Sequence, residues 1–136
     1  MNEHSITKKI YYHDTDCGGV VYYGRYLEHL EEGRAEYCQA CGVSLKDLIA
    51  SGTSVVVAHV EIRYKSPARY QDIVKVTTQI ERIGNSSVTF FQRITRGDSV
   101  LVEAKTVWVC VGKDLRPKPV PDDVAEALRG GQRDER

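Results

Sequence analysis

The sequence predicts an α+β domain in which a five-stranded antiparallel sheet wraps around one long central helix. Three observations predict this fold class. Apolar side chains recur at a helical period over residues 23–41, and they alternate at a strand period from Ser54 onward. Gly84-Asn85 and Gly97-Asp98 separate the later strand segments and are typical of hairpin turns. A single long helix near the start of a β-rich chain favours a sheet curled around that helix.

The composition limits the classes of function that the chain can serve. Its 136 residues indicate one domain, and 41% hydrophobic with 28% charged residues is an ordinary globular mixture. Basic and acidic residues number 19 each, and this zero net charge argues against non-specific nucleic-acid binding. No apolar run approaches the roughly 20 residues of a membrane span, and residues 1–7 lack a signal-peptide core. We expect a cytoplasmic protein with one domain over residues 1–129 and a disordered tail over residues 130–136.

The first strand is expected over residues 5–12, followed by a glycine-containing loop over residues 14–19. The long helix then places Tyr23, Leu27, Leu30, Tyr37 and Cys41 on its apolar face. The opposite face is expected to meet water and carries Glu28, Glu31, Glu32, Arg34 and Glu36. Gly33 costs a helix about 1 kcal/mol relative to alanine, so we expect it to allow a close approach to the sheet.

A short second helix is expected over residues 44–50, with Ser44 as its N-cap. In the following strand, the face formed by Val56, Ala58, Val60, Ile62 and Tyr64 is expected to meet the core. The opposite face is mixed and suits a partner subunit or solvent. Three more strands are expected over residues 73–83, 87–96 and 100–111, and an amphipathic stretch over residues 122–128.

The four cysteines, Cys17, Cys38, Cys41 and Cys110, are expected to be thiols in a reducing compartment. Cys38 and Cys41 form a C-x-x-C pair, but no second pair and no histidines at ligand spacing follow it. A redox motif would open a helix, whereas this pair closes one. We therefore expect core packing, with no metal and no cofactor.

The loop before the long helix carries residue types that a hydrolase needs. Asp14 and Asp16 alternate with Thr15, so the two carboxylates are expected to point in different directions. Gly18 and Gly19 allow the backbone to approach a ligand closely. The first N–H groups of the helix have no internal partner and can polarise a carbonyl oxygen. An ordinary turn and helix cap has the same composition, so the residues alone leave both readings open.

The stretch YHDTDCGGVVYYGRYL, residues 12–27, resembles the signature of the 4-hydroxybenzoyl-CoA thioesterase superfamily of hotdog-fold proteins. It is most similar to the branch that contains the Tol–Pal-associated acyl-CoA thioesterases. Supporting similarities lie at Glu31, Arg34 and Glu36 and in YKSPARYQD, residues 64–72. The resemblance covers residues 6–121. It implies a hotdog fold and hydrolysis of an acyl-CoA by dimers, often paired into tetramers, with the active site at the dimer interface.

The resemblance also assigns candidate site residues. The family's catalytic aspartate matches Asp16, which would act as nucleophile or as general base for water. The backbone N–H near Tyr23 matches the position that polarises the thioester carbonyl, and Tyr12 matches a tyrosine linked to the site. Several Tol–Pal-associated members carry histidine where this chain has Tyr23. A tyrosine is a poor base near neutral pH, so more weight falls on Asp16.

CoA carries phosphate charges, which arginine and lysine bind well. We expect Lys65, Arg69 and Arg116 to contact them. Of the histidines, His13 is expected at the surface, His29 in a structural role, and His59 near the subunit interface or the acyl pocket. The acyl group is expected to be short or aromatic, and Tyr23 favours the aromatic choice. Two alternatives remain, a hotdog dehydratase or hydratase and a non-catalytic acyl-CoA or acyl-carrier-binding protein.

Overall fold

The computed structural model describes residues 3–16 and 18–130. Its elements are β1 (Glu3–Lys9), the 3₁₀ turn η1 (Tyr12–Asp14), α1 (Tyr23–Ala40), α2 (Leu45–Ala50), β2 (Ser54–Tyr64), β3 (Ile73–Ile83), β4 (Ser87–Arg96), β5 (Ser99–Val111) and α3 (Asp122–Gly130). The predicted α+β class is confirmed. Residues 131–136 of the expected tail lie outside the described residues, whereas Gly130 ends α3.

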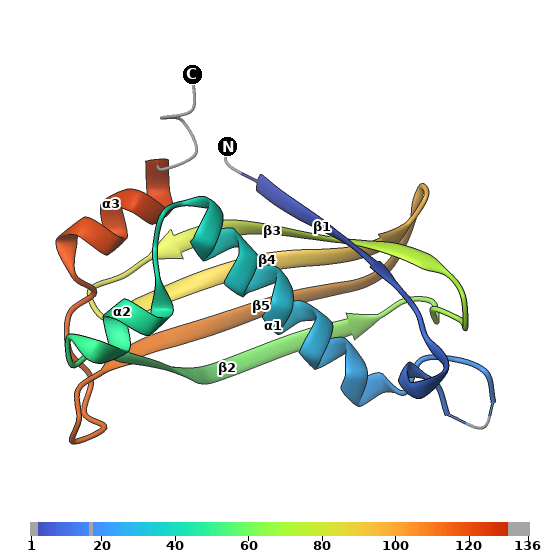
Figure 1. Ribbon diagram of the computed structural model, residues 1–136, viewed down its shortest axis with the longest axis horizontal. Helices are drawn as coiled ribbons and strands as arrows, with labels where there is room; N and C mark the ends of the chain where they lie inside the picture. The colour runs from blue at the N-terminus through green and yellow to red at the C-terminus, as the bar shows by residue number, and fades with distance from the viewer. Residues whose placement is uncertain (1–2, 17, 131–136) are drawn as a thin grey trace.

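All five strands form one antiparallel sheet in the order β1-β3-β4-β5-β2. Helix α1 crosses one face of this sheet, and α2 and α3 lie together at the end of the sheet where α1 finishes (Figure 1). Strands β1 and β2 form the two edges. No helix among the described residues combines the length and the apolar composition that crossing a membrane requires.

Helix α1 approaches the sheet closely at Gly33, as expected. A Cβ atom there would lie 2.8 Å from Val76 Cγ1 and 2.9 Å from both Gln92 Nε2 and Thr78 Oγ1. On either side of this point lie two buried clusters, one including Leu30 and Ile94 and the other including Tyr37, Phe90 and Trp108. The fold therefore depends on a glycine between two separate parts of the core.

Arg34 does not face water, so the predicted polar face of the helix was wrong at this residue. The side chain is buried, and its Nη1 donates to Gln92 Oε1 at 3.0 Å and to Thr106 Oγ1 at 3.4 Å. The guanidinium also lies 5.9 Å from the Trp108 ring centroid. Buried polar partners and an aromatic face stabilise this charge inside the protein, although burial lowers its pKa.

Strand β2 contains a bulge that the sequence pattern did not reveal. Val57 pairs with Trp108 and His59 pairs with the adjacent Val107, so Ala58 is left over. An extra residue reverses the alternation of side chains. The β2 residues that pair with the buried residues of β5 are therefore Val55 and Val57 before the bulge, and Val60, Ile62 and Tyr64 after it. The prediction of one continuous apolar face toward the core was therefore wrong before the bulge. After the bulge the predicted side of the strand is right, but only Ile62 packs against the core, since Val60 and Tyr64 are 38% and 48% exposed.

The first strand is shorter than predicted, because it ends at Lys9 and the backbone enters the 3₁₀ turn. Ser44 accepts a hydrogen bond from the N–H of Asp47 at 3.1 Å, which confirms it as the N-cap of α2. Cys38 and Cys41 are buried cysteines outside any disulfide, as the prediction of core packing requires. Burial raises the pKa of Cys38 to about 12, so little of the nucleophilic thiolate forms near neutral pH.

Candidate active site

Asp16 lies in a tight turn that leads directly into α1. Its N–H donates to Val20 O at 2.9 Å, and Gly19 N–H donates to Asp16 O at 3.1 Å. Gly19 has a φ of 80°, which glycine adopts without strain. Thr15 and Val21 then form an isolated antiparallel bridge. These bonds fix Asp16 in a turn six residues before Tyr22, the N-cap of α1.

The Asp16 carboxylate is presented to solvent rather than buried. Its Oδ1 accepts a hydrogen bond from Gly18 N–H at 2.8 Å. A Cβ atom on Gly18 would lie 3.2 Å from this oxygen, so glycine leaves room for the bond. The expected divergence of the two loop aspartates is confirmed, since Asp14 is 2% exposed.

The N-terminus of α1 presents backbone N–H groups that have no partner one turn earlier in the helix. Tyr22 is the N-cap and is extended, with φ −61° and ψ 130°, and no side chain within the described residues caps the helix. The first turn also contains no acidic residue. Tyr23 is the first helical residue, so its backbone N–H belongs to the positive end of the helix dipole.

Tyrosine rings surround this helix end. The Tyr23 ring centroid lies 5.0 Å from that of Tyr22 and 6.2 Å from that of Tyr64, while Tyr26 and Tyr64 are 5.6 Å apart. Tyr23 is 64% exposed, and the Tyr64 hydroxyl donates to Tyr23 O at 3.5 Å. A hollow of about 240 Å³ opens here and is lined by Val21, Tyr23, Tyr26, Tyr64, Lys65, Ser66 and Pro67.

The segment after β2 holds the loop in place. Val21 N–H donates to Ala68 O at 2.9 Å, and Ala68 N–H donates in turn to the Tyr26 hydroxyl at 2.9 Å. Val20 and Arg69 form a bridge, which brings the predicted CoA ligand Arg69 beside the Asp16 turn. The structure thus joins the two sequence segments, residues 12–27 and 64–72, that carried the family resemblance.

Tyr12 is 76% exposed, so its ring does not belong to the core. Its ring meets that of Tyr70 edge-to-face at 5.8 Å, and Tyr70 N–H donates to Gly19 O at 3.4 Å. Tyr12 therefore lies close to the loop through Tyr70.

Asp14 forms a buried charge cluster that the sequence did not indicate. Its Oδ2 accepts from Tyr11 N–H at 2.9 Å, and its Oδ1 accepts from Arg25 Nη2 at 2.9 Å and Nε at 3.2 Å. Burial alone would raise the pKa of Asp14, but these bonds and the nearby His29 and His13 together lower it. Burial lowers the pKa of His29, although Asp14 attracts its proton.

The predicted CoA ligands lie at two ends of the molecule. Lys65 and Arg69 are close in sequence, and Lys65 forms an ion pair with Glu103 at 3.3 Å. Arg116 follows β5, whereas the pairing of Tyr64 with Val102 places Lys65 near the start of that strand. Val111 lies nine positions after Val102 along the strand, a distance of roughly 30 Å. One copy of the chain therefore does not bring Arg116 to Lys65.

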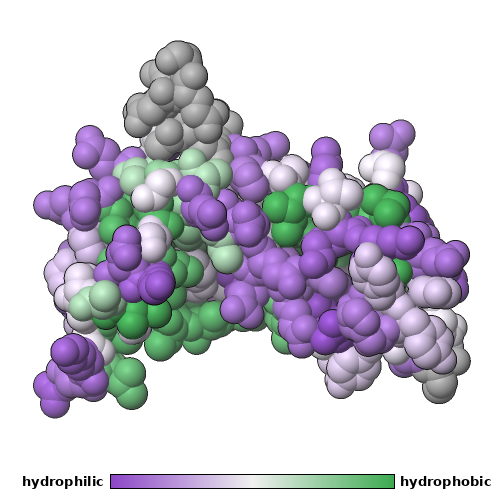
Figure 2. Space-filling view, viewed as in Figure 1, coloured by the Kyte–Doolittle hydropathy of each residue, from purple (hydrophilic) through white to green (hydrophobic). Residues whose placement is uncertain are grey.

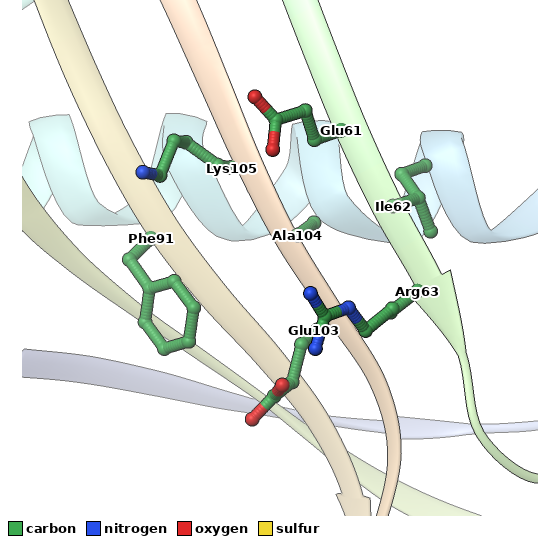
Figure 3. Close-up of a pocket in the computed structure, with 7 residues that line it drawn as sticks. All are labelled: Glu61, Ile62, Arg63, Phe91, Glu103, Ala104 and Lys105. Atoms are coloured by element: carbon green, nitrogen blue, oxygen red, sulfur yellow. The ribbon is translucent and has the colours of Figure 1, made fainter.

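The other sheet face also has a hollow, of about 410 Å³, lined by Glu61, Ile62, Arg63, Phe91, Glu103, Ala104 and Lys105 (Figure 3). Its charges are largely paired, since Glu103 also binds Arg93 at 3.1 Å and Lys105 binds Glu81 at 3.2 Å. His59 bonds to Glu61 at 2.9 Å near this hollow. Within residues 3–16 and 18–130, no three potential metal ligands come together.

The chain is similar in sequence and in fold to known thioesterases. The model of the thioesterase-like superfamily matches residues 11–128. The acyl-CoA thioester hydrolase YbgC of Escherichia coli O6:H1 is 33% identical over 123 residues, covering 89% of this chain and 92% of that protein. A probable thioesterase from Bartonella henselae superposes with a TM-score of 0.83 at 34% identity, covering 88% of this chain and 100% of that one. A DHNA-CoA thioesterase from Staphylococcus aureus superposes at 0.86 with 25% identity, covering 98% and 93%. The predicted hotdog fold is confirmed.

Proposed function

The chain belongs to the thioesterase-like superfamily, and we propose that it hydrolyses the thioester of a short-chain or aromatic acyl-CoA to the free acid and CoA. One observation carries this proposal. The exposed Asp16 carboxylate lies in a turn that leads into the N-terminus of α1, which no side chain of the described residues caps. A carboxylate in the turn that leads to these backbone N–H groups would provide both parts of a hydrolytic site, the activating group and the stabiliser of negative charge.

The reaction begins when the thioester carbonyl oxygen accepts a hydrogen bond from the backbone N–H of Tyr23. Asp16 then either attacks the carbonyl carbon or removes a proton from an attacking water. The oxygen gains negative charge in the tetrahedral intermediate, and the positive end of α1 stabilises it. Expulsion of the CoA thiolate leaves a mixed anhydride with Asp16, which water cleaves, or leaves the free acid directly.

Tyr23 contributes its backbone to this chemistry, and its ring helps to form the acyl site. The hollow of about 240 Å³ at the helix end has room for a short or aromatic acyl group. The rings of Tyr23, Tyr26 and Tyr64 line it, and aromatic faces pack well against aromatic or aliphatic groups. Tyr12 lies close to the loop and is positioned to contact the substrate beside Tyr70.

A second copy of the chain completes the CoA site in this proposal. Strand β2 is a sheet edge whose exposed side chains include Val56, Val57 and Val60. Antiparallel pairing of two such edges would place the Ser54 end of one copy beside the Tyr64 end of the other. The loop with Arg116 follows the strand that pairs with Ser54, so it would approach the partner's Lys65 and Arg69. Together these cations would bind the CoA phosphates.

The experiment is free-thiol release from a panel of short, medium and aromatic acyl-CoAs, with Asp16→Asn as the matched variant. The wild type should release CoA from at least one substrate, and Asp16→Asn should lose at least about 100-fold in kcat. Its assembly mass should be unchanged, because asparagine keeps the acceptor for Gly18 N–H. Binding without release would support a non-catalytic acyl-CoA protein, and hydration of an enoyl-CoA would support the hydratase alternative. Near-normal rates in Asp16→Asn would show that another carboxylate acts, and Glu31 or Glu36 would be tested next.

A further inference from the structure

The two aspartates of the loop lie in opposite environments. Asp16 is exposed, whereas Asp14 is 2% exposed and carries a charge in the interior. A buried carboxylate is costly unless hydrogen bonds and charges compensate it. Asp14 has such compensation, because both of its oxygens accept bonds from Tyr11 and Arg25. Its surroundings therefore suit a fixed, ionised side chain.

These bonds join three separate pieces of the site. Tyr11 follows β1, Asp14 lies two residues before Asp16, and Arg25 lies in the first turn of α1. The backbone adds a further tie, since Tyr22 N–H donates to Asp14 O at 3.0 Å. Asp14 thus links the Asp16 turn to the N-terminus of α1, whose N–H groups are proposed to bind the thioester carbonyl oxygen.

Charged and titratable groups surround Asp14 from every packed element. His13 Nε2 lies 3.7 Å and His29 Nε2 3.8 Å from Asp14 Oδ1. Arg25 also binds Glu28 at 2.7 Å, which holds the guanidinium from a second side. Further out, Glu32 lies 3.9 Å from His29 Nδ1 and forms an ion pair with Lys8 of β1. Arg25 is the only one of these groups that donates a side-chain hydrogen bond to Asp14 within the described part of the chain.

We propose that Asp14 is a positioning residue for the thioester hydrolysis, and that its ion pair with Arg25 holds the Asp16 turn in register with the first turn of α1. This inference rests on the proposed function. Hydrolysis requires the Asp16 carboxylate and the Tyr23 N–H to meet one carbonyl group simultaneously. A displacement of about 1 Å between such groups can lower a rate 100-fold. The two hydrogen bonds that Arg25 Nε and Nη2 donate to Asp14 Oδ1 restrict that displacement.

A purely structural role predicts a different result. If Asp14 only stabilised the fold, its loss would lower the unfolding midpoint and leave the kcat of the folded enzyme unchanged. If it positions Asp16, kcat falls in protein that is fully folded, while KM changes little because the acyl and CoA contacts are retained. The separation of kcat from KM therefore distinguishes the two roles.

The test compares Asp14→Asn, Arg25→Gln and their double variant in the acyl-CoA assay, well below the unfolding midpoint of each. Asp14→Asn keeps the size of the side chain and an acceptor for Tyr11 N–H but loses the charge that pairs with Arg25. We expect each single variant to lose about 10- to 100-fold in kcat with KM changed less than about threefold. The double variant should be no slower than the slower single variant, because both remove one interaction. Arg25→Lys, which keeps the charge but not the fork, should recover part of the rate.

Ser44→Ala is the stability control, since it removes the N-cap of α2 and should lower the unfolding midpoint without changing kcat. Wild-type kcat in folded Asp14→Asn, or additive losses in the double variant, would overturn the inference. If Asp14→Asn does not fold, Arg25→Gln and Arg25→Lys provide the same comparison. If the wild type releases no thiol from any substrate, the proposed function itself fails, and the positioning role fails with it.

Discussion

At the scale of single residues, His29 is a buried group near the candidate site whose protonation links the stability of the fold to pH. It is 4% exposed, and neither ring nitrogen has a hydrogen-bond partner within residues 3–16 and 18–130. Burial lowers its pKa below 6.5, even though Asp14 and Glu32 lie within 4 Å of the ring. The folded protein therefore holds His29 neutral at a pH where the unfolded chain would protonate it.

This difference predicts a dependence of stability on pH. Because the folded pKa is depressed, the contribution of His29 is complete above about pH 6.5 and is lost as pH falls toward the folded pKa. Urea unfolding should show a lower midpoint for the wild type at pH 5.5 than at pH 7.5. His29→Gln should have a smaller difference between the two values, since glutamine does not titrate.

The control for this experiment is His13→Gln. His13 also lies within 4 Å of Asp14, but its side chain is 70% exposed. This variant should retain the full wild-type loss of stability at the lower pH. An equal loss in the wild type and in His29→Gln would assign the pH dependence to other groups.

At the scale of elements, the contact between α1 and the sheet depends on Gly33. Alanine is a better helix former than glycine by about 1 kcal/mol. Its Cβ would nevertheless lie under 3.0 Å from Val76, Thr78 and Gln92. We expect Gly33→Ala to lower the free energy of unfolding by about 1–3 kcal/mol because overpacking outweighs the helix propensity. Chemical denaturation measures this change.

Ala35→Gly provides the matched control, because Ala35 lies on the exposed face of the same helix. There, glycine should cost only the propensity difference of about 1 kcal/mol. A Gly33→Ala variant more stable than the wild type would show that the helix can move away from the sheet without loss.

The elements that were predicted correctly have local signals. Gly97 has a φ of 57°, which explains the hairpin signal before β5, and the bounds of β3 and β4 agree with the prediction. The errors concern tertiary partners. The bulge at Ala58 depends on how β2 pairs with β5, and the burial of Arg34 depends on Gln92, Thr106 and Trp108, which are distant in sequence.

The sequence predicted the part of the candidate site that is contiguous along the chain, but not the contacts between residues that are distant in sequence. Asp16, the glycines and the helix start are contiguous in sequence, and the structure keeps them together. Asp14 belongs to the same motif, but its partners Arg25 and His29 lie 11 and 15 positions further on. Their spacing of four residues places them on one side of α1, which is the signal that could have indicated a shared contact.

At the scale of the whole molecule, one edge of the sheet is apolar and open. Val57 is 52% exposed and Val60 is 38% exposed on β2, and two apolar residues of the predicted helix stripe, Tyr23 and Leu27, are also exposed on α1. Figure 2 shows hydrophobic surface along the β2 edge beside the hydrophilic surface of α1. A long apolar edge strand favours pairing with another strand, which supports the proposed association of two copies through β2.

The last prediction tests this association by replacing two side chains whose exposed fractions are nearly equal. Val57→Lys places a charge in the proposed interface, where its burial would be unfavourable. We expect the mass in sedimentation to fall by half, with a loss of thiol release because the Arg116 loop of the second copy leaves the site. Ile73→Lys is the control, since Ile73 is 53% exposed and lies on β3, away from β2. It should leave both mass and activity unchanged. A Val57→Lys protein that keeps the wild-type mass would exclude β2 as the contact between copies, and one that is separated but fully active would show that a single copy holds the complete site.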